Sequence, residues 1–157
     1  MTDKKAIDTL NILIQINNDR MEGYETAAHE TEEEDLKELF AQLAQTSREC
    51  NEELVEEVEE LDGTPAEGTK TSGKVFRVWM DVKAALTGKD RKTILNSCEQ
   101  GEEMAVNTYK KVLEINVDDL SNDQQSIIEE QLVLIKADRD TVKELHDSFL
   151  VPSGFPT

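Results

Sequence analysis

Four carboxylates in this chain could take part in metal chemistry, because each lies within a helix-forming segment at or near the expected centre of a helical bundle. They are Glu22, Glu53, Glu102 and Asp138. In di-metal helical bundles, two helices each supply an inward Glu and the other two each supply a Glu-x-x-His pair. We therefore weigh a carboxylate site for iron or manganese against a polar bundle centre that holds no metal.

Histidine, which normally completes such a site, is scarce. The chain has two, His29 and His146, both near the ends of predicted helices, where surface or capping positions are expected. The second predicted helix has Cys50-x-x-Glu53 in place of Glu-x-x-His, and the last has no His near its middle. We expect no tightly bound cofactor, and weakly bound iron or manganese at the four carboxylates is the alternative.

Apolar residues spaced three and four apart predict helices at about 4–30, 34–61, 75–86, 91–115 and 122–149, and no strand. The stretch 62–74, rich in Gly, Thr, Ser and Pro, predicts a connection without secondary structure. This pattern predicts an all-α, ferritin-like antiparallel four-helix bundle with a long crossover that contains one short extra helix. We expect residues 1–150 to form the bundle and 151–157 a C-terminal tail.

Several polar residues interrupt the apolar seams at one level, counting from the helix turns at about 1.5 Å per residue. The expected central polar layer contains Asn17, Ser47, Cys50, Glu102, Gln131, Asp138 and Arg139, with Glu22, Glu25, Glu49 and Glu53 near its edge. Buried polar groups must be paired. The layer therefore fixes the helix register by hydrogen bonding, holds a metal ion, or lines a pocket for another ligand.

The remaining reactive or aromatic residues fit a packed core. Cys50 and Cys98 lie on apolar helix faces, and without a Cys-x-x-Cys spacing we expect them to be reduced core residues. Trp79, with Phe76 and Met80, is expected to pack rather than to form a ligand site.

Charge and hydropathy limit the partners. Seventeen basic and thirty-five acidic side chains give a formal net charge of -18, which disfavours nucleic acid and anionic membranes. No apolar run approaches the roughly 20 residues of a membrane span, and polar residues interrupt the first twenty residues, so we expect a helix there rather than a signal peptide. We expect a cytoplasmic protein with no nucleic acid or membrane partner. The apolar tail 149–157 favours a homodimer, and an unidentified protein partner is left open.

Three motifs carry a resemblance to a known family: Glu22-Gly23-Tyr24, the stretch from Trp79 to Gly88, and Cys98-Glu99-Gln100-Gly101-Glu102. In these the chain resembles the DUF2383 family, bacterial four-helix-bundle proteins of unknown function in the ferritin-like superfamily. The resemblance covers nearly everything up to the last helix. It implies the fold and a possible metal heritage, but no activity.

The resemblance also bears on single positions. Glu22 and Glu102 match acidic positions of the family. Many members have a His just before the Asp that matches Asp140, where this chain has Arg139, and position 50 can be His or aromatic but is Cys50 here. Both departures weaken metal binding. Arg139 is expected instead to bring a fixed positive charge to the carboxylates, since guanidinium stays protonated and pairs with two oxygens.

These observations predict a non-catalytic ferritin-like bundle, a bacterial stress-related or assembly protein that acts through its surface. The alternative is a carboxylate-bridged metal-binding protein, or a metal-dependent oxidase of the ferritin-like class, with a degenerate site.

Overall fold

The computed structural model describes residues 2–67, 73–88 and 90–148. These residues form five α-helices and one 3-10 turn, with no strand among them, so the all-α prediction is confirmed. The elements are α1 (Thr2–Glu30), α2 (Glu34–Glu60), α3 (Gly73–Gly88), α4 (Arg91–Ile115), η1 (Val117–Asp119) and α5 (Asn122–Asp147). In the part described, no helix is both long enough and apolar enough to cross a membrane.

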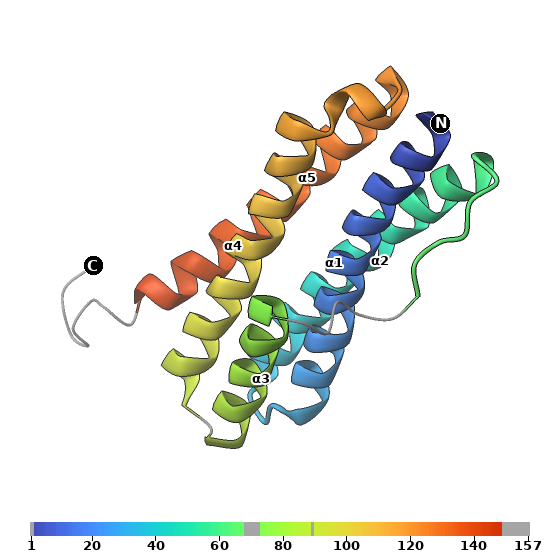
Figure 1. Ribbon diagram of the computed structural model, residues 1–157. Coiled ribbons are helices and arrows are strands. Elements are labelled where there is room, and N and C mark those ends of the chain that lie inside the picture. Colours follow the sequence, from blue (N-terminus) through green and yellow to red (C-terminus); the bar gives the residue numbers. More distant parts are fainter. Residues whose placement is uncertain (1, 68–72, 89, 149–157) are drawn as a thin grey trace.

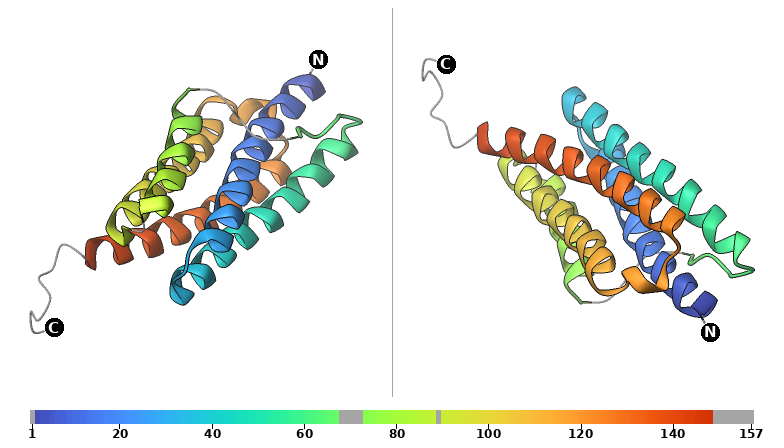
Figure 2. Two further views of the ribbon diagram at one scale, coloured as in Figure 1. Left: turned by 90° about the horizontal axis from the view of Figure 1, so that it is seen from below. Right: turned by 90° about the horizontal axis from the view of Figure 1, so that it is seen from above.

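The four long helices form two antiparallel pairs that pack side by side (Figure 1). The pairs are α1 with α2 and α4 with α5, and α2 and α4 run in the same direction. The short helix α3 follows α2 in the chain and packs on α1 and α4. It runs antiparallel to α4 and lies beside it in the left view of Figure 2. After α2 and before α4, the chain thus runs back along the bundle as α3. The short extra helix was predicted to lie in this connection.

The helix boundaries agree with the predicted ones within two residues, because strong stop and start signals lie there. After α2, the amide of Gly63 donates to Val58 O (2.9 Å) and that of Asp62 donates to Glu59 O (3.0 Å). These two bonds form a Schellman motif, whose left-handed residue is Asp62, with φ 61°. Ser121 caps α5 in a capping box with Gln124. Helix α5 is described to Asp147, so the predicted tail 149–157 lies outside the described residues.

The core consists of two apolar clusters, one toward each end of the bundle. One joins the N-terminal half of α1 and the C-terminal half of α2 to parts of α4 and α5; it includes Leu10, Leu54, Tyr109 and Ile128. The other joins the C-terminal half of α1 and the N-terminal half of α2 to α3 and to the remaining parts of α4 and α5. It includes Tyr24, Phe40, Val82 and Val142. Of the predicted polar layer, Asn17, Ser47, Glu102 and Asp138 lie in sequence between the two clusters, one on each long helix.

Trp79 positions α3 on the bundle and packs against both clusters, as predicted. Its ring lies so close to Gly23 of α1 that a Cβ there would be 2.3 Å from Trp79 Cε3. It also makes an edge contact with Tyr24, with ring centroids 5.1 Å apart. Met80, predicted to pack beside it, is instead exposed, and the side chain of Phe76 lies outside those described.

Candidate functional site

Arg20 lies at the centre of the buried polar layer. Its side chain is 1% exposed. Nε and Nη2 donate to the two carboxylate oxygens of Glu102, each at 2.8 Å, which is the bidentate geometry of a strong charge-assisted pair. Nη2 also donates to Asp138 Oδ2 at 3.2 Å, and Nη1 donates to Ser47 Oγ at 2.6 Å. One guanidinium therefore connects α1 to α2, α4 and α5.

Glu102 is fully buried, and a tyrosine completes its surroundings. The Tyr24 hydroxyl donates to Glu102 Oε2 at 2.8 Å, so this carboxylate accepts three hydrogen bonds. Burial alone would lower the pKa of Arg20, but the charge and hydrogen bonds of Glu102 raise it, and the guanidinium stays protonated. Burial, and then the charge of Glu102, raise the pKa of Tyr24. Tyr24 is therefore a permanent donor here.

A chain of neutral groups extends the layer from Arg20 toward the surface. Ser47 Oγ donates to Asn17 Oδ1 (2.8 Å), and Asn17 Nδ2 donates to the Tyr109 hydroxyl (2.7 Å). That hydroxyl donates to Gln131 Oε1 (2.7 Å), and Gln131 Nε2 donates to Glu53 Oε1 (2.9 Å). Side chains from α1, α2, α4 and α5 thus form one connected network, in which each buried polar group has partners.

The charges of the layer do not balance, because Asp138 adds a second carboxylate to the Arg20–Glu102 pair. Asp138 is 8% exposed. Burial raises the pKa of Asp138, the charge of Arg20 lowers it, and the charge of Glu102 raises it again; the outcome is a raised value. The layer therefore carries excess negative charge, or a proton, at the Asp138 side.

Most residues predicted for the central layer do meet there. Asn17, Ser47, Glu102, Gln131 and Asp138 lie in the network by their side chains. Cys50 contributes its main-chain oxygen, which accepts from Gln131 Nε2 at 3.1 Å.

The four candidate metal carboxylates do not converge. Glu102 and Asp138 share Arg20, Glu53 lies at the far end of the network, and Glu22 is exposed to solvent. Within the described residues, no group of three or more His, Cys, Asp or Glu side chains is placed to hold a metal ion.

Arg139 differs from its prediction. Its guanidinium donates to Glu103 Oε1 at 3.3 Å and to Asp140 Oδ1 at 3.1 Å rather than to the layer. The reason is helical geometry. Arg139 follows Asp138 by one residue, which turns its side chain about 100° away from the inward face. Of the predicted edge residues, Glu25 and Glu49 are exposed, and Glu25 pairs with Arg48.

Arg20 was missing from the predicted layer, although the sequence holds a signal for it. It follows Asn17 by three residues and precedes Tyr24 by four, so all three share one helix face. The predicted layer held two inward carboxylates, which require a cation at the same level when they are buried. A mid-helix arginine usually lies in solvent, so periodicity alone does not assign position 20 to the interior.

The thiols lie beside the network, and the imidazoles lie away from it. Cys50 and Cys98 are free and buried, as predicted. Burial raises the pKa of the Cys50 thiol to about 12, and burial together with Glu102 raises that of Cys98 further. His29 is exposed, whereas His146 is half-buried, with Nδ1 2.6 Å from Glu99 Oε2.

Comparison with known proteins places most of the chain in one family. The family model of a domain of unknown function, DUF2383, matches residues 5–115, which run from α1 to the end of α4. No curated protein matches the chain. The matched region contains both Arg20 and Glu102, whereas Gln131 and Asp138 come from α5, beyond it.

Proposed function

The chain belongs to the DUF2383 family, whose function is unknown, and we propose that it is a non-catalytic, ferritin-like bundle in which Arg20 is the cation of the central layer. The observation that supports this is the guanidinium between Glu102 and Asp138. In carboxylate-bridged bundles, metal ions supply the positive charge between such groups. Here a side chain supplies it, and a side chain cannot dissociate.

The other groups of the layer also favour a structural role. Burial raises the pKa values of Tyr24, Tyr109 and Cys98, so these groups stay neutral and are poor nucleophiles. A buried, fully bonded network of this kind fixes helix register and specifies one packing. The protein would then act through its surface, as an assembly or stress-related protein does.

A carboxylate-bridged metal site is the second candidate, because the layer has two carboxylates for one guanidinium. A divalent cation could bind at Asp138 and Glu102 if Arg20 turned away. Carboxylates alone favour metals that prefer oxygen ligands and bind them more weakly than a site with imidazole.

Metal loading separates the two candidates. The protein, purified without chelators, would be incubated with Fe²⁺ under argon or with Mn²⁺, passed through gel filtration and analysed for metal content. We expect clearly less than one ion per chain in the wild type. Roughly two ions per chain, the stoichiometry of a di-metal site, lost again in Glu102→Gln, would overturn the proposal in favour of the metal-binding candidate.

We also propose that the protein is a homodimer. The apolar tail that favours a dimer lies outside the described residues. Exposed apolar side chains on α5 support the dimer independently. Val133 is 67% exposed and Leu134 is 48% exposed, one residue apart. Light scattering of the full chain and of a chain ending at Phe149 tests this. A monomer mass for both would exclude the dimer, and a dimer mass for both would exclude only the role of the tail.

A further inference from the structure

Trp79 of α3 fills a slot between two glycines. A Cβ at Gly23 of α1 would lie 2.3 Å from Trp79 Cε3, and a Cβ at Gly101 of α4 would lie 3.4 Å from Trp79 Cζ2. These two atoms are on opposite sides of the six-membered ring, so the indole lies between the two helices. The slot exists because neither glycine carries a side chain that would fill it.

The slot lies directly beside the central polar layer. Gly23 directly precedes Tyr24 on α1, where the Tyr24 ring meets the Trp79 ring edge-on, with centroids 5.1 Å apart. Gly101 directly precedes Glu102 on α4. The Tyr24 hydroxyl donates to Glu102 Oε2 at 2.8 Å, and Glu102 is fully buried. The indole therefore covers the side of the layer that faces α3.

The layer itself is built without α3. The hydrogen bonds described above for the layer join α1, α2, α4 and α5 to one another. The buried members of the apolar cluster around Leu10 and Leu54 come from these same four helices and from Leu120. The four long helices therefore have a polar layer and an apolar cluster in common that remain when α3 is removed.

Few buried side chains attach α3 to the bundle. Among its described side chains, 77–88, four are buried: Val78, Val82, Ala85 and Leu86. Trp79 is only partly buried, whereas the longer helix α4 buries ten residues. Segments that bury little apolar surface open locally at a lower free energy than the whole fold.

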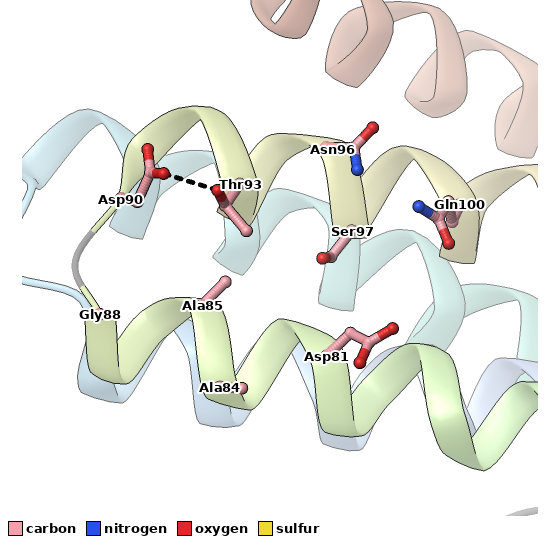
Figure 3. A pocket seen from close by; sticks show the side chains of 9 residues that line it. All are labelled: Asp81, Ala84, Ala85, Gly88, Asp90, Thr93, Asn96, Ser97 and Gln100. Carbon is pink, nitrogen blue, oxygen red and sulfur yellow. Dashed lines mark hydrogen bonds between the residues drawn. The ribbon is translucent and has the colours of Figure 1, made fainter.

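A groove between α3 and α4 limits their contact further. Its volume is about 470 Å³. Figure 3 shows the small residues Ala84, Ala85 and Gly88 of α3 along this groove, opposite the polar side chains of Thr93 and Ser97 on α4. The described side chains leave this space open. They therefore contribute little apolar contact along the groove to hold α3 in place.

We propose that α3 is a lid over the central polar layer and that Trp79 closes it. When the lid opens, α3 and the indole leave α1 and α4 while the four long helices stay folded, and water reaches Tyr24 and Glu102 through the slot. This opening costs less free energy than global unfolding, because only the contacts of α3 are lost. The proposal concerns the cover of the layer and not its charge, so it stands or falls independently of the function proposed above.

Amide hydrogen exchange of the full chain, followed by mass spectrometry of its peptides, measures the opening. We expect the amides of α3 to exchange faster than those in the middle of α2 and α4. The opening should depend only weakly on added urea, because it exposes little surface. Equal rates and equal urea dependence in all these helices would mean that α3 opens only when the whole chain unfolds, and would overturn the proposal.

Two matched valine variants separate local opening from global unfolding, since Val82 of α3 and Val58 of α2 are both buried but belong to different clusters. Val82→Ala should speed the exchange of α3 and of the long helices roughly tenfold, because about two buried methyl groups are lost from the closed state. Val58→Ala should speed the long helices by a similar factor but leave α3 within about twofold, because its contacts persist when the lid is open. An equal effect of Val58→Ala on all helices would overturn the proposal.

The role of the indole is tested by Trp79→Phe, which leaves part of the slot empty. This variant, folded by circular dichroism, should speed the exchange of α3 at least as much as Val82→Ala does. Exchange of α3 at the wild-type rate would show that the indole does not hold the lid closed and would overturn that part of the proposal.

Discussion

Arg20→Met removes the positive charge from the central layer while it keeps a side chain of similar length. Glu102, fully buried, would then retain one hydrogen bond, from Tyr24, and no counter-charge. Breaking a buried ion pair by removing one partner costs about 3–5 kcal/mol. For a chain of this size each kcal/mol lowers Tm by about 2–4 °C, so we expect a fall of roughly 6–20 °C.

Urea unfolding followed by circular dichroism and by the fluorescence of Trp79 measures this cost. Arg48→Met is a matched control, because Arg48 pairs with Glu25 at the surface, where the loss should be about 1 kcal/mol or less. Arg139→Met should likewise be mild and additive with Arg20→Met, since the two arginines have no partner in common.

The pairing itself is tested by Glu102→Leu. Alone, this change leaves the buried guanidinium short of its main partner and should also cost about 3–5 kcal/mol. Combined with Arg20→Met it should cost much less than the sum of the two, because neither charge is then buried without the other. A cost below about 1 kcal/mol for Arg20→Met, or strict additivity with Glu102→Leu, would refute the assignment of Arg20 as the centre of the layer.

Three further measurements follow from the same structure. Burial raises the pKa of Asp138 above its ordinary 3.8, so the folded protein holds a proton that the unfolded chain has released; stability is lost as pH rises through the raised value. Asp138→Asn should therefore gain stability relative to wild type from about pH 4 to about pH 7, and a pH-independent difference would contradict this. Gly23→Ala should be destabilising by about 1–2 kcal/mol, since the clash with Trp79 outweighs the helix propensity gain of about 1 kcal/mol, whereas Gly101→Ala, with its nearest contact at 3.4 Å, should be neutral or stabilising. Cys50 and Cys98 should react with an aromatic disulfide reagent only on unfolding, and fast reaction of either in the native protein would contradict their burial.

The helices could be predicted because burial and local signals agree along the chain. Apolar residues recur on one face of each long helix, and Gly63, Asp90 and Ser121 stand where the chain must stop or start. The position of α3 could not be predicted in the same way. It depends on the absence of a side chain at Gly23, which has meaning only once Trp79 is known to lie against it. Periodicity identifies the buried face of a helix but not the neighbour it meets.

The candidate site illustrates the same limit with charge. A strict three-four alternation through Asn17 and Tyr24 would place Met21 inward on α1, but an α-helix with 3.6 residues per turn drifts from that repeat. In the structure Arg20 takes the inward position and Met21 is only partly buried. Charge balance is the sounder guide, because two inward carboxylates require a cation at their own level and angle. Arg139, one residue after Asp138, cannot meet that condition, whereas Arg20, three residues after Asn17, does. The Arg20–Glu102 pair also lies wholly within the region 5–115 matched to the family, so that region contains the complete bidentate pair and α5 only adds Asp138 to it.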